Sequence, residues 1–112
     1  MEKIVEQGLL YDFYGDLLTE HQRQVFGDVI LGDLSLSEAA EEYGVSRQGI
    51  HDLMRRVDSQ LRGYEEKLHM VERFMEVKEQ TQKIREIASR GSVGKEQQEM
   101  IVNLCDSILA RL

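Results

Sequence analysis

The chain has 112 residues, with 14 lysines and arginines against 21 aspartates and glutamates, and its formal net charge is -7. Hydrophobic residues make up 41% of the sequence, enough for the core of one domain, so a fully disordered chain is excluded. With only one cysteine and no run of about 18 apolar residues, a disulfide-stapled secreted scaffold and a membrane-spanning protein are also excluded.

The first two predicted helices cover residues 2–18 and the segment from Thr19 to Gly32. In residues 2–18 the apolar side chains recur at helical spacing on one wide stripe. The stripe has Leu9, Phe13 and Leu17 at steps of four residues, with Leu10, Tyr14 and Leu18 beside them. The second helix opens at Thr19, because Gln22 follows three residues later in a capping-box pattern, and it stops at Gly32.

Two further helices are predicted between Ser35 and the middle of the chain. The third opens at Ser35, with Glu38 three residues on, and it is short because Gly44 ends it. The fourth begins after Ser46, a favourable N-cap residue. Its apolar positions, at helical spacing, are Ile50, Leu53, Val57 and Leu61.

The second half of the chain predicts a helical extension. Residues 64–89 form a long amphipathic pattern, residues 90–94 (RGSVG) are a loop, and residues 95–111 form a last helix. Gly63 leaves open whether the fourth helix continues through it or turns there. We therefore expect an all-α protein with a helix-turn-helix core in residues 1–62 and an extension in residues 63–112, packed together as one domain.

Residues 35–56, SLSEAAEEYGVSRQGIHDLMRR, predict a helix-turn-helix. This motif needs a small residue where two helices cross, a glycine in a left-handed turn, and apolar residues that lock the second helix against the first. The residues at the required positions are Ala40, Gly44, Val45, Ile50 and Leu53. An ordinary helical hairpin with a serine cap and a glycine turn would meet only part of this pattern, so we favour the helix-turn-helix.

The charges are unevenly distributed along the chain. Residues 1–46 contain ten acidic and two basic side chains, whereas residues 47–67 contain four acidic and five basic ones. Neutralising phosphates requires a basic face, so any DNA contact must be made locally. The basic excess lies in the fourth helix, where the arginines are Arg47, Arg55, Arg56 and Arg62.

The N-terminal part of the fourth helix would then read DNA. The candidate contacts are Ser46, Arg47, Gln48, His51, Arg55 and Arg56. Arg47 suits guanine and Gln48 suits adenine, while Arg55 and Arg56 suit phosphate, and Ser46 with the first backbone N–H groups can hold another phosphate.

Two residues count against strong DNA reading by this helix. Gly49 costs about 1 kcal/mol of helix propensity relative to alanine, and Asp52 places a negative charge on the side that would face the groove. The alternative is a domain that keeps this fold and binds a protein partner through its acidic helical surface.

Two families resemble this sequence. The run LTEHQRQVF…GDLSLSEAAEEYGVSRQGIHDLMRRVDSQL is similar to the promoter-reading region four of bacterial sigma factors, and residues 2 to about 75, with DFYGDLLTEHQR and GVSRQGIHD, resemble the YlxM family. The resemblance implies an all-helical, DNA-binding-like fold and a regulatory link to the signal recognition particle pathway. For the protein-binding alternative, the resemblance implies that this particle and its GTPase are the partners.

The apolar stripes of residues 64–89 and 95–111 offer more surface than a small helix-turn-helix core can cover. Packing within the chain would take part of these stripes. We expect the remainder to form a homodimer interface, because helix-turn-helix proteins often read two half-sites related by two-fold symmetry.

The sequence shows no pattern typical of an enzyme. His21, His51 and His69 lie far apart without ligands at metal-binding spacing, and no glycine-rich phosphate-binding motif occurs. Cys105 falls on the apolar stripe of the last helix, as expected for a core residue. The acidic, polar-interrupted start is unlike a signal peptide. We therefore expect a cytoplasmic protein that is not an enzyme and has no cofactor, metal or membrane partner.

Overall fold

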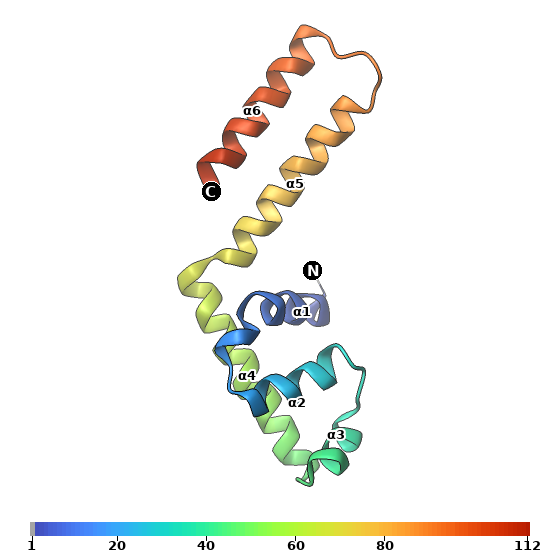
Figure 1. Ribbon diagram of the computed structural model, residues 1–112, viewed down its shortest axis with the longest axis vertical. Coiled ribbons are helices and arrows are strands. Elements are labelled where there is room, and N and C mark those ends of the chain that lie inside the picture. Colours follow the sequence, from blue (N-terminus) through green and yellow to red (C-terminus); the bar gives the residue numbers. More distant parts are fainter. Residues whose placement is uncertain (1) are drawn as a thin grey trace. The chain divides into compact units, whose positions relative to one another are not determined.

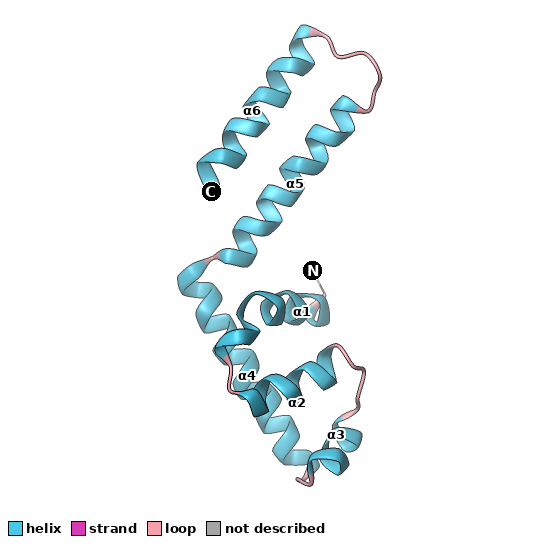
Figure 2. Cartoon of the chain, in the orientation of Figure 1, coloured by secondary structure: helices cyan, strands magenta, loops and turns pink. Residues whose placement is uncertain are grey.

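The computed structural model describes residues 2–112, and within this range all the regular secondary structure is helical (Figure 2). The elements are α1 (Lys3–Tyr14), the 3-10 helix η1 (Gly15–Leu17), α2 (Glu20–Ile30), α3 (Leu36–Tyr43), α4 (Arg47–Leu68), α5 (Met70–Ala88) and α6 (Lys95–Arg111). The predicted all-α class is confirmed. No helix in residues 2–112 combines the length and apolar character needed to cross a membrane.

The helices divide into two compact units, one ending at His69 and the other formed by Met70–Leu112. The first unit holds α1 to α4, with α4 in contact with the other three helices, and the second is the antiparallel hairpin of α5 and α6 (Figure 1). The loop predicted at residues 90–94 joins the two helices of the hairpin, and α6 has the bounds predicted for the last helix.

The first predicted helix is shorter in the structure than residues 2–18. It ends at Tyr14, and a single 3-10 turn follows, in which Leu18 N–H donates to the Gly15 carbonyl at 3.1 Å. The tighter 3-10 turn changes the direction of the following side chains. Leu10, Tyr14 and Leu18 are buried, whereas Leu17, inside the 3-10 turn, is 55% exposed.

The two predicted capping boxes are both present. At the start of α2, Gln22 N–H donates to Thr19 Oγ1 at 3.2 Å and Thr19 N–H donates to Gln22 Oε1 at 3.1 Å. At the start of α3 the same pair of bonds joins Ser35 and Glu38, at 3.0 and 3.1 Å. Donation from the Ser35 backbone and hydroxyl lowers the pKa of the Glu38 carboxyl. Local side-chain chemistry thus sets where both helices begin.

The core of the first unit lies between α4 and the helices packed on it. Its fully buried side chains are Tyr14, Val25, Phe26, Ile50, Val57 and Leu61. Three of these come from α4, at the inward positions that the helical spacing predicted. The one polar group on these six side chains, the Tyr14 hydroxyl, has a hydrogen-bond partner, because it donates to Glu65 Oε1 at 2.6 Å.

The prediction of one helix from residue 64 to residue 89 is wrong. Helix α4 continues through Gly63 to Leu68. The helix is interrupted at His69, whose φ of 55° is left-handed. His69 N–H donates to the Glu65 carbonyl at 2.8 Å and closes the last turn of α4. A left-handed residue cannot continue a right-handed helix, so α5 begins anew at Met70.

Candidate nucleic-acid interface

The turn between α3 and α4 has the geometry of a helix-turn-helix. Gly44 is left-handed, with φ of 66°, and its N–H donates to the Ala40 carbonyl. Val45 N–H donates to the same carbonyl at 3.0 Å, which closes a Schellman turn. Ala39 and Ala40 are buried where α3 packs on α4. The predicted turn and its small crossing residue are therefore both found.

The N-terminus of α4 is capped by Ser46, as its sequence predicted. Ser46 Oγ accepts a hydrogen bond from Gly49 N–H at 3.0 Å, which leaves the hydroxyl proton available for a ligand. A Cβ added to Gly49 would lie 3.2 Å from this oxygen, a tight contact. The glycine that costs helix propensity thus leaves room for the cap.

The structure places the six predicted contact residues at or near the start of α4. They are all exposed: Ser46, Arg47, Gln48, His51, Arg55 and Arg56. On the opposite side, Ile50, Leu53 and Val57 are buried in the core. The first two and a half turns of α4 therefore present polar side chains outward from a fixed support.

Asp52 is engaged with its neighbours on this outward side. Gln48 Nε2 donates to Asp52 Oδ1 at 3.0 Å, and His51 Nδ1 lies 3.7 Å from the same oxygen. Gln48 keeps its amide oxygen and one N–H for a base, because only one of its donor hydrogens is used. The negative charge expected at Asp52 is thus held beside two of the predicted contact residues.

The basic cluster of α4 is smaller than the sequence indicated. Arg62 forms ion pairs with Glu6 of α1 and, at 2.9 Å, with Asp58. Burial alone would raise the pKa of Asp58, but hydrogen bonds from Arg62 and Gln7 bring the pKa below its usual value. Within residues 2–112, Arg47, Arg55 and Arg56 have no ion-pair partner. These three guanidinium groups are therefore free for a ligand.

A groove of about 270 Å³ lies between α1 and α4, beside Arg55. It is lined by Lys3, Gln7, His51, Met54, Arg55 and Asp58. Two of the six predicted contact residues, His51 and Arg55, thus share a concave surface with α1. The sequence did not predict that α1 lines this groove, because no pattern of neighbouring residues indicates that residues 3 and 7 pack on the middle of α4.

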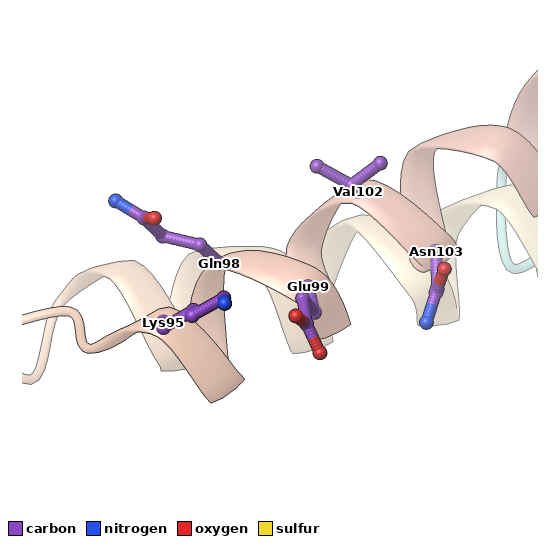
Figure 3. A pocket seen from close by; sticks show the side chains of 5 residues that line it. All are labelled: Lys95, Gln98, Glu99, Val102 and Asn103. Atoms are coloured by element: carbon purple, nitrogen blue, oxygen red, sulfur yellow. The ribbon is translucent and has the colours of Figure 1, made fainter.

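A second hollow lies along α6 in the hairpin unit. Its five lining side chains, drawn in Figure 3, come from three successive turns of one helix. They spread along the helix instead of converging on a common point (Figure 3). Binding and catalytic sites need convergent polar groups, so we place the candidate site on α4.

Comparison with known proteins agrees with this architecture. Residues 1–102 match the model of a family described as "UPF0122: Putative helix-turn-helix protein, YlxM / p13 like". The UPF0122 protein YlxM of Bacillus subtilis is 40% identical over 108 residues, which cover 96% of this chain and 94% of that protein. A UPF0122 protein of Bacillus velezensis is 39% identical over the same shares of the two chains.

A third relative matches over a shorter segment. A UPF0122 protein of Caldanaerobacter subterraneus is 46% identical over 78 residues, or 70% of this chain and 67% of that protein. The helix-turn-helix that describes the family is a binding motif, and here it is formed by α3 and α4. The chain therefore belongs to the UPF0122 family of YlxM-like helix-turn-helix proteins.

Proposed function

We propose that this protein binds duplex DNA in a regulatory role, with the start of α4 lying in the major groove. The observation that carries the proposal is the outward set of Arg47, Gln48 and Arg55 on the second helix of a helix-turn-helix whose inner side is buried. In this motif the N-terminal residues of the second helix contact base edges. Arg47 binds guanine, Gln48 binds adenine, and Arg55 and Arg56 bind phosphates.

A homodimer is part of this proposal. Helix α6 has no buried residue, and the large exposed apolar side chains of the hairpin are Met70, Phe74, Met100, Val102, Leu109 and Leu112. A second copy of the hairpin would cover some of these side chains, and a two-fold dimer suits a helix-turn-helix protein that binds two half-sites. Sedimentation at micromolar concentration should give twice the chain mass of 13.0 kDa, and a species of 13.0 kDa would overturn the dimer.

A second candidate function is binding to a protein or ribonucleoprotein, for which the family resemblance favours the signal recognition particle and its GTPase. The observation that favours it is the acidic surface of α3, where Glu38, Glu41 and Glu42 are all exposed. In DNA-bound helix-turn-helix proteins this first helix crosses the phosphate backbone, so these carboxylates would oppose docking on DNA. They suit a basic protein surface instead.

The first experiment is a fluorescence-anisotropy titration against random duplex DNA at several salt concentrations. If α4 contacts phosphates, log K should fall linearly with the logarithm of the salt concentration, despite the net charge of -7. Absence of binding even at low salt would overturn the DNA proposal. The same titration against signal recognition particle components would then test the second candidate.

Variants of α4 separate base reading from phosphate binding. Arg47→Ala should cost about 1–3 kcal/mol on the preferred sequence and little on others, whereas Arg56→Ala should weaken all sequences alike and reduce the salt slope by about 1. Arg90→Ala is the matched control, because Arg90 lies beyond α5 and pairs with Glu86. If neither α4 variant differs from the control, the recognition helix has no role in DNA binding.

The acidic surface can be tested in the same way. Charge reversal of Glu41 and Glu42 to lysine should slow association with a basic protein partner, most strongly at low salt. The same change should strengthen binding to random duplex DNA if α3 lies over the phosphate backbone. An unchanged association rate with the signal recognition particle at low salt would count against the protein-binding candidate.

A further inference from the structure

We propose that the groove between α1 and α4 holds a backbone phosphate of the same duplex that α4 reads, with Lys3 as a phosphate ligand outside the helix-turn-helix. This inference rests on the proposed function and extends it, because it adds α1 to the DNA interface. The groove is lined by basic groups from both helices: Lys3 from α1 and His51 and Arg55 from α4.

The charge balance of the groove favours an anion. Its one carboxylate, Asp58, accepts hydrogen bonds from Gln7 and Arg62, both at 2.9 Å, so each carboxylate oxygen already has one donor. Lys3 lies near enough to help lower the pKa of Asp58, yet it forms no ion pair with any of residues 2–112. Arg62 is shared between Asp58 and Glu6, but among the groove-lining residues themselves the two positive charges of Lys3 and Arg55 outweigh the single negative charge of Asp58.

The size of the groove suits a phosphodiester. Its volume of about 270 Å³ compares with about 30 Å³ for one water molecule, so a phosphate and its neighbouring sugar atoms can enter. His51 and Arg55 are four residues apart and therefore lie one above the other on α4. Both line the groove on the helix that would carry the base contacts, so a phosphate at its rim would lie next to the major groove.

Helix α1 is fixed against α4, so the backbone of Lys3 has a defined position relative to the recognition residues. Gln7 Nε2 donates to Asp58 Oδ1 at 2.9 Å, and Glu6 pairs with Arg62. Both bonds lie within the first turn and a half of α1, next to Lys3. Because this backbone is already held in place, only the Lys3 side chain has to be ordered when the DNA docks.

The test is the salt dependence of DNA binding by Lys3→Ala, measured by anisotropy on two unrelated duplexes. Loss of one phosphate contact should reduce the salt slope by about 1 and weaken both duplexes alike, by roughly tenfold near 0.1 M salt. Lys3→Arg should retain wild-type binding. The matched control is Lys67→Ala, since Lys67 is exposed in the last turn of α4, away from the groove.

The outcomes separate this inference from the proposed function. If wild-type protein binds DNA and Arg56→Ala weakens it, but Lys3→Ala matches Lys67→Ala, then only the groove proposal is overturned. If wild-type protein does not bind DNA at all, both proposals are overturned. Thermal unfolding by circular dichroism should be the same for Lys3→Ala and wild type, so a weaker slope with unchanged stability supports a phosphate contact.

Discussion

The two units of this protein differ in how they bury apolar surface. Eleven of the thirteen buried apolar residues in the described chain belong to the first unit, whereas the hairpin contributes only Val71 and Ile87. The hairpin instead leaves side chains such as Met100 and Leu109 exposed, and it is joined by polar bonds, including one of 2.7 Å from Gln80 Nε2 to Ser107 Oγ. The first unit thus has its own core, whereas the hairpin leaves large apolar side chains exposed.

Truncation of a core residue should produce the largest effect. Phe26 is fully buried and stacks on Tyr11 with the ring centroids 5.9 Å apart, so Phe26→Ala should cost about 3–5 kcal/mol of unfolding free energy. Leu109 is 67% exposed, and Leu109→Ala should change the stability of the monomer by less than about 0.5 kcal/mol. Urea denaturation followed by circular dichroism measures both.

The concentration dependence of these variants sharpens the comparison. If the hairpin is the dimer interface, Leu109→Ala should raise the dimer dissociation constant in sedimentation while leaving the core intact. Phe26→Ala should show the opposite pattern, with loss of stability at every concentration. A large, concentration-independent loss of stability in Leu109→Ala would mean that this side chain belongs to a core, and the distinction between the two units would fail.

A smaller effect is expected at the left-handed glycines, which occur once in each unit. Gly44 has φ of 66° and Gly91 has φ of 91°, and an added Cβ would meet no atom within 4 Å at either. Substitution by alanine should therefore cost about 1–2 kcal/mol through backbone strain alone. Gly44→Ala should reduce amide protection across α3 and α4 and weaken DNA binding, whereas Gly91→Ala should reduce protection only in α5 and α6, as hydrogen exchange would show.

The parts of this fold that sequence reasoning predicted are those governed by local rules. The caps at Thr19, Ser35 and Ser46 and the turn at Gly44 depend on residues within a few positions of each other. The inward positions of α4 follow from helical periodicity. The break at His69 was missed because glycine is the residue that most readily adopts a left-handed conformation, and the nearby glycine, Gly63, lies inside a continuous helix.

The candidate site was predicted in part for the same reason. Its exposed residues on α4 follow from the helical period, and the Gln48–Asp52 hydrogen bond could have been found from the i, i+4 spacing. The pairing of Arg62 with Glu6, 56 residues away, and the position of Lys3 beside Arg55 depend on how α1 packs on α4. Such contacts are set by tertiary packing, which no spacing along the chain reveals.

The smallest expected effect concerns a polar bond that joins α3 to α2 within the first unit. The Tyr43 hydroxyl donates to Asp28, and this hydrogen bond, with the nearby charges of Asp28 and Glu42, raises the pKa of Tyr43 from 10.0 to about 12. Because the folded value lies above the unfolded one, the bond stabilises the fold fully below pH 10 and is lost as the pH rises through about 12.

Absorbance titration should show one tyrosine ionising near pH 12, and Asp28→Asn should bring the pKa of this tyrosine back toward 10. Asp16→Asn is the control, since Asp16 pairs with Arg23 at 3.2 Å. If Asp28→Asn leaves the titration unchanged, the bond does not hold α3 on α2 in solution, and the first unit relies on its apolar core alone at this contact.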